Sequence, residues 1–381
     1  MKIGIDARMY GPKVGGGGLG RYVEQLVTEL QLTDNQNRYL LFVKPENFQE
    51  CQISNKHFQK KQINIHWYTL KEQLQLAKTI DQEALDLIHF PHWNVPFNLK
   101  TPFVVTIHDL LLLEEPRSAR ATTRHPWIYA LKYQAYKWVL KNTLIKSRKI
   151  IAVSEFTKAS ILKHFPQINP KKITVIYEGV TKLSPTTPET PTTPETPTTP
   201  YLLYVGNAYP HKNLESLLHA FSFFHKIHPE VHLVLTGRKD VFYDRLKKEL
   251  SEIEVPEKVI DFVMNPTDQD LSQLYKNATL YLFPSRHEGF GLPPLEAMQA
   301  GVPVAAARTS SLPEILGEAA IYFSPDDIEE MVLVMEQALQ DKNLRKNLTK
   351  KGQEQIKYYS WEKMAKEIQN IYKQEQTDKC L

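Results

Sequence analysis

The stretch FPSRHEGFGLPPLEAMQAG, residues 283–301, contains the end of a predicted strand, a turn of glycines and prolines, and a short helix. Pro293 and Pro294 fit the first helical positions, where a missing N–H has no consequence. Gly301 fits the residue just past the helix end. A strand that leads through such a turn into a helix is a repeating part of α/β folds.

Two carboxylates, Glu288 and Glu296, lie in this stretch with seven residues between them. In one continuous helix they would lie about 80° apart around the axis, and the glycines disfavour such a helix. We expect Glu288 on the loop and Glu296 in the first helical turn, with the N–H groups of residues 289–292 facing an anion. Carboxylates bind hydroxyls, so the stretch suits a ligand that is both sugar and phosphate. A capped helix with an early glutamate is also ordinary architecture, because the helix dipole favours it.

Length and composition indicate a folded protein of two domains. The chain has 381 residues, 42% of them hydrophobic, and a net charge of +4 that does not favour nucleic acid as a partner. Cys51 and Cys380 form no metal-binding spacing, which fits a reducing compartment and no structural metal. The N-terminal MKIGIDAR is not a signal peptide, and no apolar run approaches the roughly 18 residues of a membrane span. We expect a cytoplasmic protein.

Apolar strands alternate with helical or irregular segments, which predicts an α/β fold with parallel, doubly wound sheets. A second series of strands starts with YLLYVG at residue 201 and continues through HLVLTG, VIDFV, TLYLFPS and PVAAA. Ligands collect at the carboxyl ends of strands in such sheets. The expected strands of the first half are residues 2–7, 39–43, 63–68, 85–90, 103–107, 150–153 and 173–176.

Residues 185–200, PTTPETPTTPETPTTP, mark the boundary between the domains. Proline at every third position predicts an extended polyproline II segment that cannot build a core. We interpret it as a tether, with binding of a proline-recognition module as the alternative. The predicted organisation is an N-terminal domain over 1–182, a linker over 183–200, a C-terminal domain over 201–355, and a C-terminal helical segment over 356–381 that packs back on the N-terminal domain.

A glycine-rich run, Gly15–Gly20, follows the first strand and precedes a predicted helix of roughly residues 19–30. Such a turn lets a phosphate approach the backbone, and a flexible surface loop is the alternative. The run also satisfies GxGxxG, but four consecutive glycines satisfy many patterns. The next strand ends at Lys44 instead of the acidic residue that a dinucleotide site requires, so we discount a nicotinamide oxidoreductase.

Histidines and a lysine stand at other predicted strand ends. His108 and Asp109 follow the strand FVVTI, and we expect the pair to face the ligand, with Asp109 orienting the imidazole. His89 and His92 occupy the corresponding place around DLIHF, although a lone histidine is more often a packing or surface residue. Lys212, in the loop GNAYPHKN, lies where its ammonium can meet a phosphate near a helix N-terminus.

From Pro116 to Ser154 the chain has no acidic residue, and basic residues alternate with aromatic ones. On a helix this composition is typical of a surface that lies on anionic lipid. A solvated helix with an aromatic core face and a nucleic-acid contact are the alternatives. A peripheral contact at the inner face of the membrane would involve Arg124, Trp127, Lys132, Lys137, Trp138 and Lys141.

Several segments together resemble the retaining glycosyltransferases of family 4, whose GT-B fold consists of two Rossmann-like domains facing a cleft. The matching segments are IDAR, GGGGLGRY, YVGNAYPHKN, PSRHEGFGLPPLEAM and AGVPVAAARTSSLPEILGEAAIYF, and the likeness covers nearly the whole chain.

The resemblance implies roles for individual residues. Glu288 would contact hydroxyls of the transferred sugar, and Glu296 would accept both ribose hydroxyls of the nucleotide. His108 would lie beside the donor sugar, with Asp109 on the acceptor or diphosphate side. The diphosphate would be held by Lys212, the backbone at Gly18 and the N–H groups of Phe290, Gly291 and Leu292, and the segment around Val263 would contact the base.

One position departs from the family. Many relatives carry arginine where this chain has Asn207, so Lys212 would carry more of the charge, with help from Arg21 or Arg238.

The implied activity is transfer of a hexose, mannose or glucose first, from a nucleotide-diphosphate sugar to a glycan or lipid-linked acceptor of a surface polysaccharide. The resemblance implies front-face attack with retention and no metal or other cofactor. Double displacement with Glu288 as nucleophile, an epimerase of the same fold and a non-catalytic sugar-nucleotide-binding protein are the alternatives.

Overall fold

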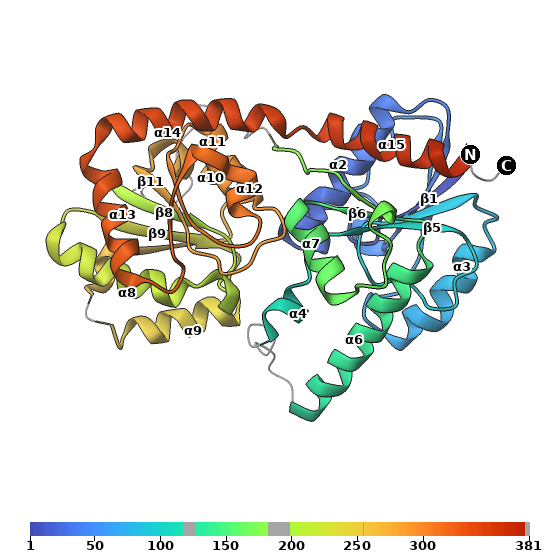
Figure 1. Ribbon diagram of the computed structural model, residues 1–381, viewed down its shortest axis with the longest axis horizontal. Helices are drawn as coiled ribbons and strands as arrows, with labels where there is room; N and C mark the ends of the chain where they lie inside the picture. The colour runs from blue at the N-terminus through green and yellow to red at the C-terminus, as the bar shows by residue number, and fades with distance from the viewer. Residues whose placement is uncertain (117–125, 182–198, 254, 378–381) are drawn as a thin grey trace. The chain divides into compact units, whose positions relative to one another are not determined.

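The computed structural model describes residues 1–116, 126–181, 199–253 and 255–377. Arg124, Cys380 and nearly all of the predicted linker 183–200 lie outside these ranges. The described residues of 1–110, 122–179 and 360–381 form one compact unit, and those of 111–121 and 180–359 form another (Figure 1). We call these the first and the second unit.

The first unit contains a sheet in which every strand pair is parallel. Its strand order is β3-β2-β1-β4-β5-β6-β7. Successive strands are added on one side of β1 as far as β3 and on the other side from β4 onward, so the topological switch point lies between β1 and β4, where open α/β sheets bind ligands. Helices and strands alternate around it as predicted (Figure 1). The strands are β1 (Lys2–Asp6), β2 (Arg38–Val43), β3 (Phe58–Gln62), β4 (Leu87–Phe90), β5 (Phe103–Ile107), β6 (Lys149–Ala152) and β7 (Ile173–Val175).

The predicted strand at residues 63–68 is wrong, because the strand is β3, which ends one residue before it. β3 pairs only with β2, so it is an edge strand, and its sequence FQKKQ buries Phe58 alone. A polar edge strand gives no apolar run, whereas Ile63 and Ile65 are buried as loop residues and mimic one.

The glycine-rich run is more helical than expected. A short helix, α1 (Pro12–Gly15), precedes Gly16, and α2 (Gly17–Thr33) starts two residues earlier than predicted. Gly16 turns the chain between the two helices with a φ of +75°. Gly18 therefore lies in the first turn of α2 and not in a loop.

The other helices of the first unit are α3 (Ala77–Asp81), α6 (Pro126–Lys146), α7 (Glu155–His164) and α15 (Trp361–Thr377). The last of these packs along α2, where Gln369 Nε2 donates to Thr33 Oγ1 over 2.8 Å. Tyr372 of α15 contacts His89 of β4 with 2.6 Å between Oη and Nδ1. The end of the chain thus contributes buried side chains to the first unit.

The second unit contains a parallel sheet of order β10-β9-β8-β11-β12-β13 (Figure 1). Its topological switch point lies between β8 and β11. Its strands are β8 (Tyr201–Val205), β9 (His232–Gly237), β10 (Ile260–Met264), β11 (Leu280–Phe283), β12 (Val304–Ala307) and β13 (Ala320–Phe323). The helices are α4 (Leu111–Glu114), α8 (Leu214–Ile227), α9 (Val241–Leu250), α10 (Asp268–Asn277), α11 (Leu292–Gln299), α12 (Leu312–Leu316), α13 (Ile328–Gln340) and α14 (Lys342–Gln355). Within the described ranges, no helix has the length and apolar character to cross a membrane.

Candidate active site

Lys212 and Glu288 meet at the topological switch point of the second sheet, between β8 and β11. Lys212 ends a single 3-10 turn that follows β8, and Glu288 lies on the loop that follows β11. The distance between Lys212 Nζ and Glu288 Oε1 is 2.5 Å, and the side chains are only 14% and 13% exposed. An ion pair with so little solvent around it is a strong local interaction.

The loop that carries Lys212 is held by the next residue. Asn213 adopts the left-handed conformation, with a φ of +59°, and begins α8. Its Nδ2 donates to the carbonyl oxygens of Pro284, over 3.2 Å, and Pro325, over 2.6 Å. These contacts join the Lys212 loop to the segment after β11, which positions the ammonium beside Glu288.

Two serines hold the Glu288 loop. Glu288 N donates to Ser310 Oγ over 3.0 Å, and Ser311 Oγ lies 3.0 Å from the carbonyl oxygen of Glu288 and 3.1 Å from that of Phe290. Ser310 has a φ of +52°, a conformation that non-glycine residues rarely adopt. Both serines belong to the family-like segment that starts AGVPVAAARTSSLP, but nothing in the sequence indicated that they support the loop.

The helix α11 starts one residue earlier than the prolines predicted, at Leu292, with Gly291 at a φ of +103°. Glu296 therefore lies in the second turn, so its predicted place in the first turn is wrong. Its side chain is 7% exposed, and Tyr275 Oη donates to its Oε2 over 3.4 Å. Residue 301 is a glycine with a φ of +81°, as a residue just past a helix end requires.

Because prolines have no N–H, the backbone donors at this helix start come from Phe290, Gly291 and Leu292. The side chains of Phe290 and Leu292 are buried, which holds that backbone in place. The loop before α11 thus places a short run of amides close in sequence to Glu288.

The remaining predicted donor residues are spread over both units. Asn207 follows β8, and its carbonyl oxygen accepts from Tyr204 Oη over 2.7 Å. Val263 lies on β10 and accepts from Thr236 Oγ1 over 2.7 Å. Gly18 and Arg21 lie on α2 of the first unit, Gly18 exposed and Arg21 half-buried.

His108 follows β5 in the first unit and uses both ring nitrogens. Nδ1 lies 2.9 Å from Glu178 Oε1, and Nε2 lies 2.9 Å from the carbonyl oxygen of Pro91. Both partners accept hydrogen bonds, so the ring suits the doubly protonated imidazolium. Burial lowers the pKa of His108, but the hydrogen bond and charge of Glu178, the hydrogen bond to the Pro91 carbonyl and the charge of Asp109 together outweigh it, and the pKa is raised overall.

The partner of His108 differs from the prediction. The carboxylate that orients the ring belongs to Glu178, which is buried, whereas Asp109 is exposed. Glu178 follows the end of β7 by three residues, so the strand-end rule could have identified it. His89 lies inside β4 with no exposed surface, and its Nε2 contacts Thr106 Oγ1 over 2.9 Å.

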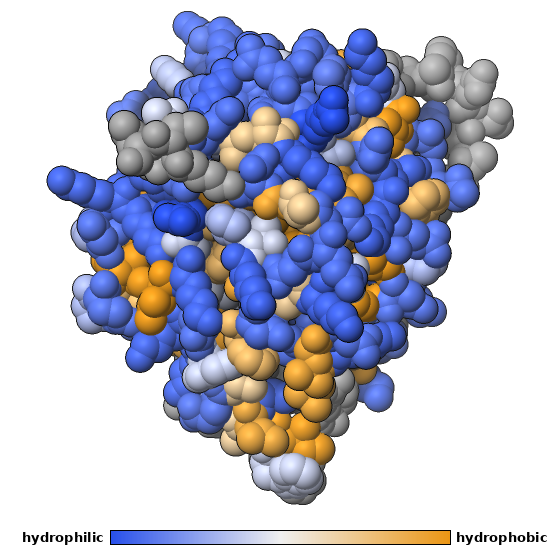
Figure 2. All heavy atoms as spheres, turned by 90° about the vertical axis from the view of Figure 1, so that its right-hand side faces the viewer, coloured by the Kyte–Doolittle hydropathy of each residue, from blue (hydrophilic) through white to orange (hydrophobic). Residues whose placement is uncertain are grey.

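Residues 126–146 of the predicted membrane segment form α6, whose two faces differ. Tyr136, Leu140 and Leu144 are buried, while Trp127 and Trp138 are 63% and 51% exposed. Figure 2 shows apolar side chains gathered at the lower end of the face in view, where α6 lies in Figure 1. Of the predicted lysines, Lys132 and Lys141 are exposed, and Lys137 is half-buried over the ring of Tyr133.

Two family patterns match the chain. The pattern of "Glycosyltransferase Family 4" covers residues 16–182, and that of "Glycosyl transferases group 1" covers residues 188–355. The chain belongs to the GT-B glycosyltransferases. This assignment confirms the predicted family, the α/β fold and the enzyme class.

One related sequence and two solved structures of similar fold match this glycosyltransferase over almost its full length. It is 28% identical over 375 residues to O-antigen chain mannosyltransferase B of Escherichia coli, covering 93% of this chain and 96% of that protein. Sucrose-phosphate synthase from Thermosynechococcus elongatus has a similar structure, with a TM-score of 0.76, 20% identity and 98% of each chain covered. Anabaena HepE in complex with UDP-glucose matches with a TM-score of 0.74, 16% identity, and 98% and 100% of the two chains covered.

Proposed function

We propose that this glycosyltransferase moves a hexose, mannose or glucose first, from a nucleotide-diphosphate sugar to a glycan or lipid-linked acceptor, with retention of configuration. The observation that carries the proposal is the Lys212–Glu288 pair beside the start of α11, where the sheet reverses direction. Support for the substrates comes from the O-antigen mannosyltransferase and from the complex of HepE with UDP-glucose. The acceptor would belong to a surface polysaccharide.

In the proposed site, the diphosphate competes with Glu288 for Lys212. The ammonium would turn from the carboxylate to the phosphate, and the released Glu288 would accept hydrogen bonds from hydroxyls of the transferred sugar. Glu296 would take the ribose hydroxyls. The N–H groups of residues 290–292 and the backbone at Gly18 would complete the phosphate contacts, with Asn207 as a neutral donor and Val263 at the base.

The proposed reaction depends on stabilising the leaving group. The bond between the anomeric carbon and the phosphate oxygen breaks, and the acceptor oxygen attacks from the same face. The leaving phosphate takes the acceptor proton, so Glu288 need not form a covalent intermediate. Negative charge grows on the diphosphate, where Lys212 and the backbone amides are already positioned, and such preorganised donors are a major source of rate enhancement. This scheme includes no metal ion.

His108 would act in the same reaction as a cation. A doubly protonated imidazole cannot serve as a general base, but its Nε2–H can move from the Pro91 carbonyl to an oxygen of the donor sugar. Glu178 would keep the ring charged and oriented. We assign Arg21 and Asp109 to the acceptor or diphosphate side.

A panel of nucleotide sugars tests the proposed function. Bound ligand stabilises a protein by mass action, so a true donor raises Tm with increasing concentration and its diphosphate does so as well. We expect a hexose nucleotide to shift Tm and to be consumed when an oligosaccharide acceptor is added. An altered sugar nucleotide without acceptor would indicate an epimerase, and binding without turnover would indicate a non-catalytic protein.

We further propose that α6 lies on an anionic membrane surface. Trp127, Leu131, Trp138 and Ile145 are each about half exposed or more, and their spacing places them within about 40° of one another around the helix. Lys137 and Lys141 lie in the same helix, which contains no acidic residue. An exposed apolar stripe beside cations suits the boundary between lipid tails and headgroups.

A further inference from the structure

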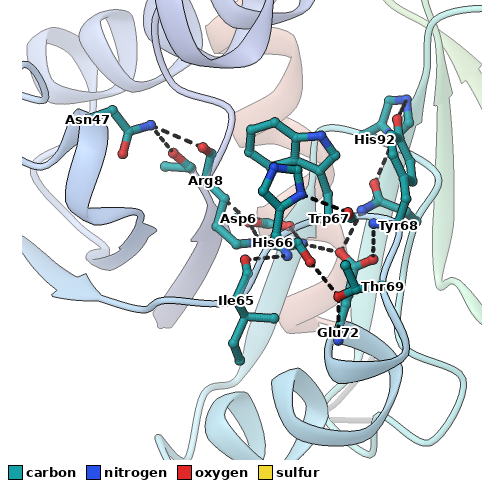
Figure 3. A network of polar contacts seen from close by, with 12 residues as sticks. Asp6, Arg8, Asn47, Ile65, His66, Trp67, Tyr68, Thr69, Glu72 and His92 are labelled. Carbon is teal, nitrogen blue, oxygen red and sulfur yellow. Dashed lines mark hydrogen bonds and ion pairs between the residues drawn. The ribbon is translucent and has the colours of Figure 1, made fainter.

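The carboxyl ends of the neighbouring strands β1 and β4 carry a group of side chains that the donor site does not use. Arg8 follows β1, and His92 and Trp93 follow β4. The loop that carries Tyr68 brings this residue beside His92 (Figure 3). Open α/β sheets bind ligands where the strand order reverses, so this place is a candidate site on topology alone.

A buried ion cluster forms the base of this group. Arg8 is 1% exposed, and its Nη2 lies 2.6 Å from Glu72 Oε1 and 2.7 Å from Asp6 Oδ2. The guanidinium also donates to the carbonyl oxygen of Ile65 over 3.3 Å. Burying these charges has an energetic cost, and apolar side chains would fill the same space without it. The cluster positions the loop of residues 65–72 against the end of β1.

Tyr68 occupies a conformation that costs energy. Its φ is +60°, which a bulky side chain rarely adopts, and its N–H donates to Glu72 Oε2 over 2.8 Å. The side chain that this conformation presents is 53% exposed. The strained backbone of Tyr68 places its ring partly in solvent, so the strain is not offset by burial of the ring in the core. Residues with strained backbone conformations are frequent at ligand sites.

A chain of hydrogen bonds fixes the imidazole beside Tyr68. Asn94 Nδ2 donates to Glu72 Oε1 over 2.6 Å, which leaves Asn94 Oδ1 as the acceptor for His92 Nδ1, also over 2.6 Å. His92 therefore carries its proton on Nδ1, because burial lowers its pKa to about 4 and the ring is neutral. Its Nε2 is an acceptor that faces Tyr68 Oη over 3.4 Å (Figure 3).

Three rings make up what we call the aromatic platform: Tyr68, His92 and Trp93. Tyr68 and Trp93 are stacked, with 5.4 Å between centroids and 21° between planes, and the rings of His92 and Trp93 are 5.1 Å apart. Trp93 also makes an edge-to-face contact with Tyr136 of α6, with 4.7 Å between ring centroids. The exposed ring of Tyr68 thus rests on a fixed base.

We propose that the aromatic platform binds a pyranose ring of the acceptor glycan, an inference that rests on the proposed function. A pyranose offers a face of C–H groups, which packs on an aromatic ring, and an edge of hydroxyls, which needs polar partners. Tyr68 supplies the ring, and Tyr68 Oη and His92 Nε2 would exchange their mutual 3.4 Å contact for a donor and an acceptor to the sugar hydroxyls. Pro91, whose carbonyl oxygen contacts His108 Nε2 over 2.9 Å, directly precedes His92, so the platform is joined in sequence to a residue that contacts the candidate catalytic histidine.

Ligand-observed saturation-transfer NMR with methyl α-D-mannopyranoside and methyl α-D-glucopyranoside, on the full chain without nucleotide, tests the platform. We expect saturable binding of at least one glycoside to the unaltered protein, with transfer strongest to ring C–H protons. Tyr68→Ala should weaken binding by about tenfold or more, while Tyr68→Phe, which keeps the ring, should stay within about threefold. Leu70→Ala, an exposed neighbour at 82% exposure, is the matched control and should leave binding unchanged.

Tyr68→Gly separates a binding role from a structural one. Glycine accepts a φ of +60° without strain, so this variant should keep a Tm close to that of the unaltered chain and still lose binding. No saturable binding to the unaltered protein, or equal binding by Tyr68→Ala, would overturn the platform. These measurements contain no donor, so the two proposals can fail separately. Absence of glycoside binding would not affect the nucleotide-sugar assays, and a negative donor assay would not prevent glycoside binding from being measured.

Discussion

Lys212 Nζ lies 2.5 Å from Glu288 Oε1, and each residue is the other's ion-pair partner in a site with little solvent. Replacing either one removes the ion-pair partner of the other, so each substitution reports on two residues. We expect Lys212→Met to lower kcat/KM by about 100-fold or more, because it removes a cation from the developing diphosphate charge. Glycosyl transfer measured over a range of donor concentrations would check this. Unchanged transfer in Lys212→Met would exclude Lys212 from the chemistry.

Glu288→Gln and Glu296→Gln should affect different kinetic constants. Glu288 is assigned to the transferred sugar, so its amide variant should reduce kcat by about 10- to 100-fold with a smaller change in donor KM. Glu296 is assigned to the ribose, so its variant should mainly raise donor KM. Glu354→Gln, on the exposed side of α14, is the control. A reversed pattern, with Glu296 controlling turnover, would contradict the division between the two carboxylates.

Glu178→Gln should change the pH dependence of the protein through His108. The pKa of His108 is raised in the fold, so its contribution to stability is complete below its unfolded pKa of about 6.5 and is lost as pH rises through the folded pKa. Removing the carboxylate lowers that folded pKa. We expect the fall in Tm as pH rises above about 6.5 to be smaller in Glu178→Gln, and the imidazole NMR resonances of His108 to titrate at lower pH. Identical titration in both proteins would remove Glu178 as the cause.

The α6 proposal predicts salt-sensitive binding to vesicles that contain anionic lipid. Lys137→Glu with Lys141→Glu should abolish co-sedimentation at low salt, because about 1 kcal/mol of attraction is lost for each lysine near the surface. Lys346→Glu with Lys350→Glu makes the same charge change at the same spacing on α14 and should leave binding unchanged. Trp127→Ala should weaken binding at all salt concentrations. Equal loss in both lysine pairs would mean that net charge alone, and not α6, attracts the vesicles.

Gly179→Ala should loosen α15. A Cβ at Gly179 would lie 2.2 Å from the backbone nitrogen of Trp361 and 2.5 Å from its ring, closer than real atoms approach. We expect a loss of stability of about 1–3 kcal/mol and faster amide hydrogen exchange in α15. Gly16→Ala, at an exposed site where a Cβ would meet no atom within 4 Å, tests the cost of a positive φ without a clash.

Local patterns in the sequence were enough to predict the fold class and the family. Both sheets were visible because most strands are continuous apolar runs, and the loop 288–292 was visible because glycine and proline mark helix starts. β3 was missed because an edge strand needs few apolar residues. The strand-end rule could have placed Glu178 at this edge of the sheet, but not its pairing with His108. Glu178 and His108 are 70 positions apart, and Glu72 and Arg8 are 64 apart, and no local pattern encodes such pairings.

Because α15 belongs to the first unit, the two units cannot be completed in the order of their synthesis. The first unit is built from both ends of the chain, with Tyr372 bonded to His89 and Gln369 to Thr33, while residues 180–359 of the second unit are contiguous. On the ribosome the first unit remains incomplete until its last helix has emerged, whereas the second can close earlier. Domains usually fold in the order of their synthesis, with the N-terminal one first. In this chain the second unit is complete at residue 359, so it can finish folding before the first unit.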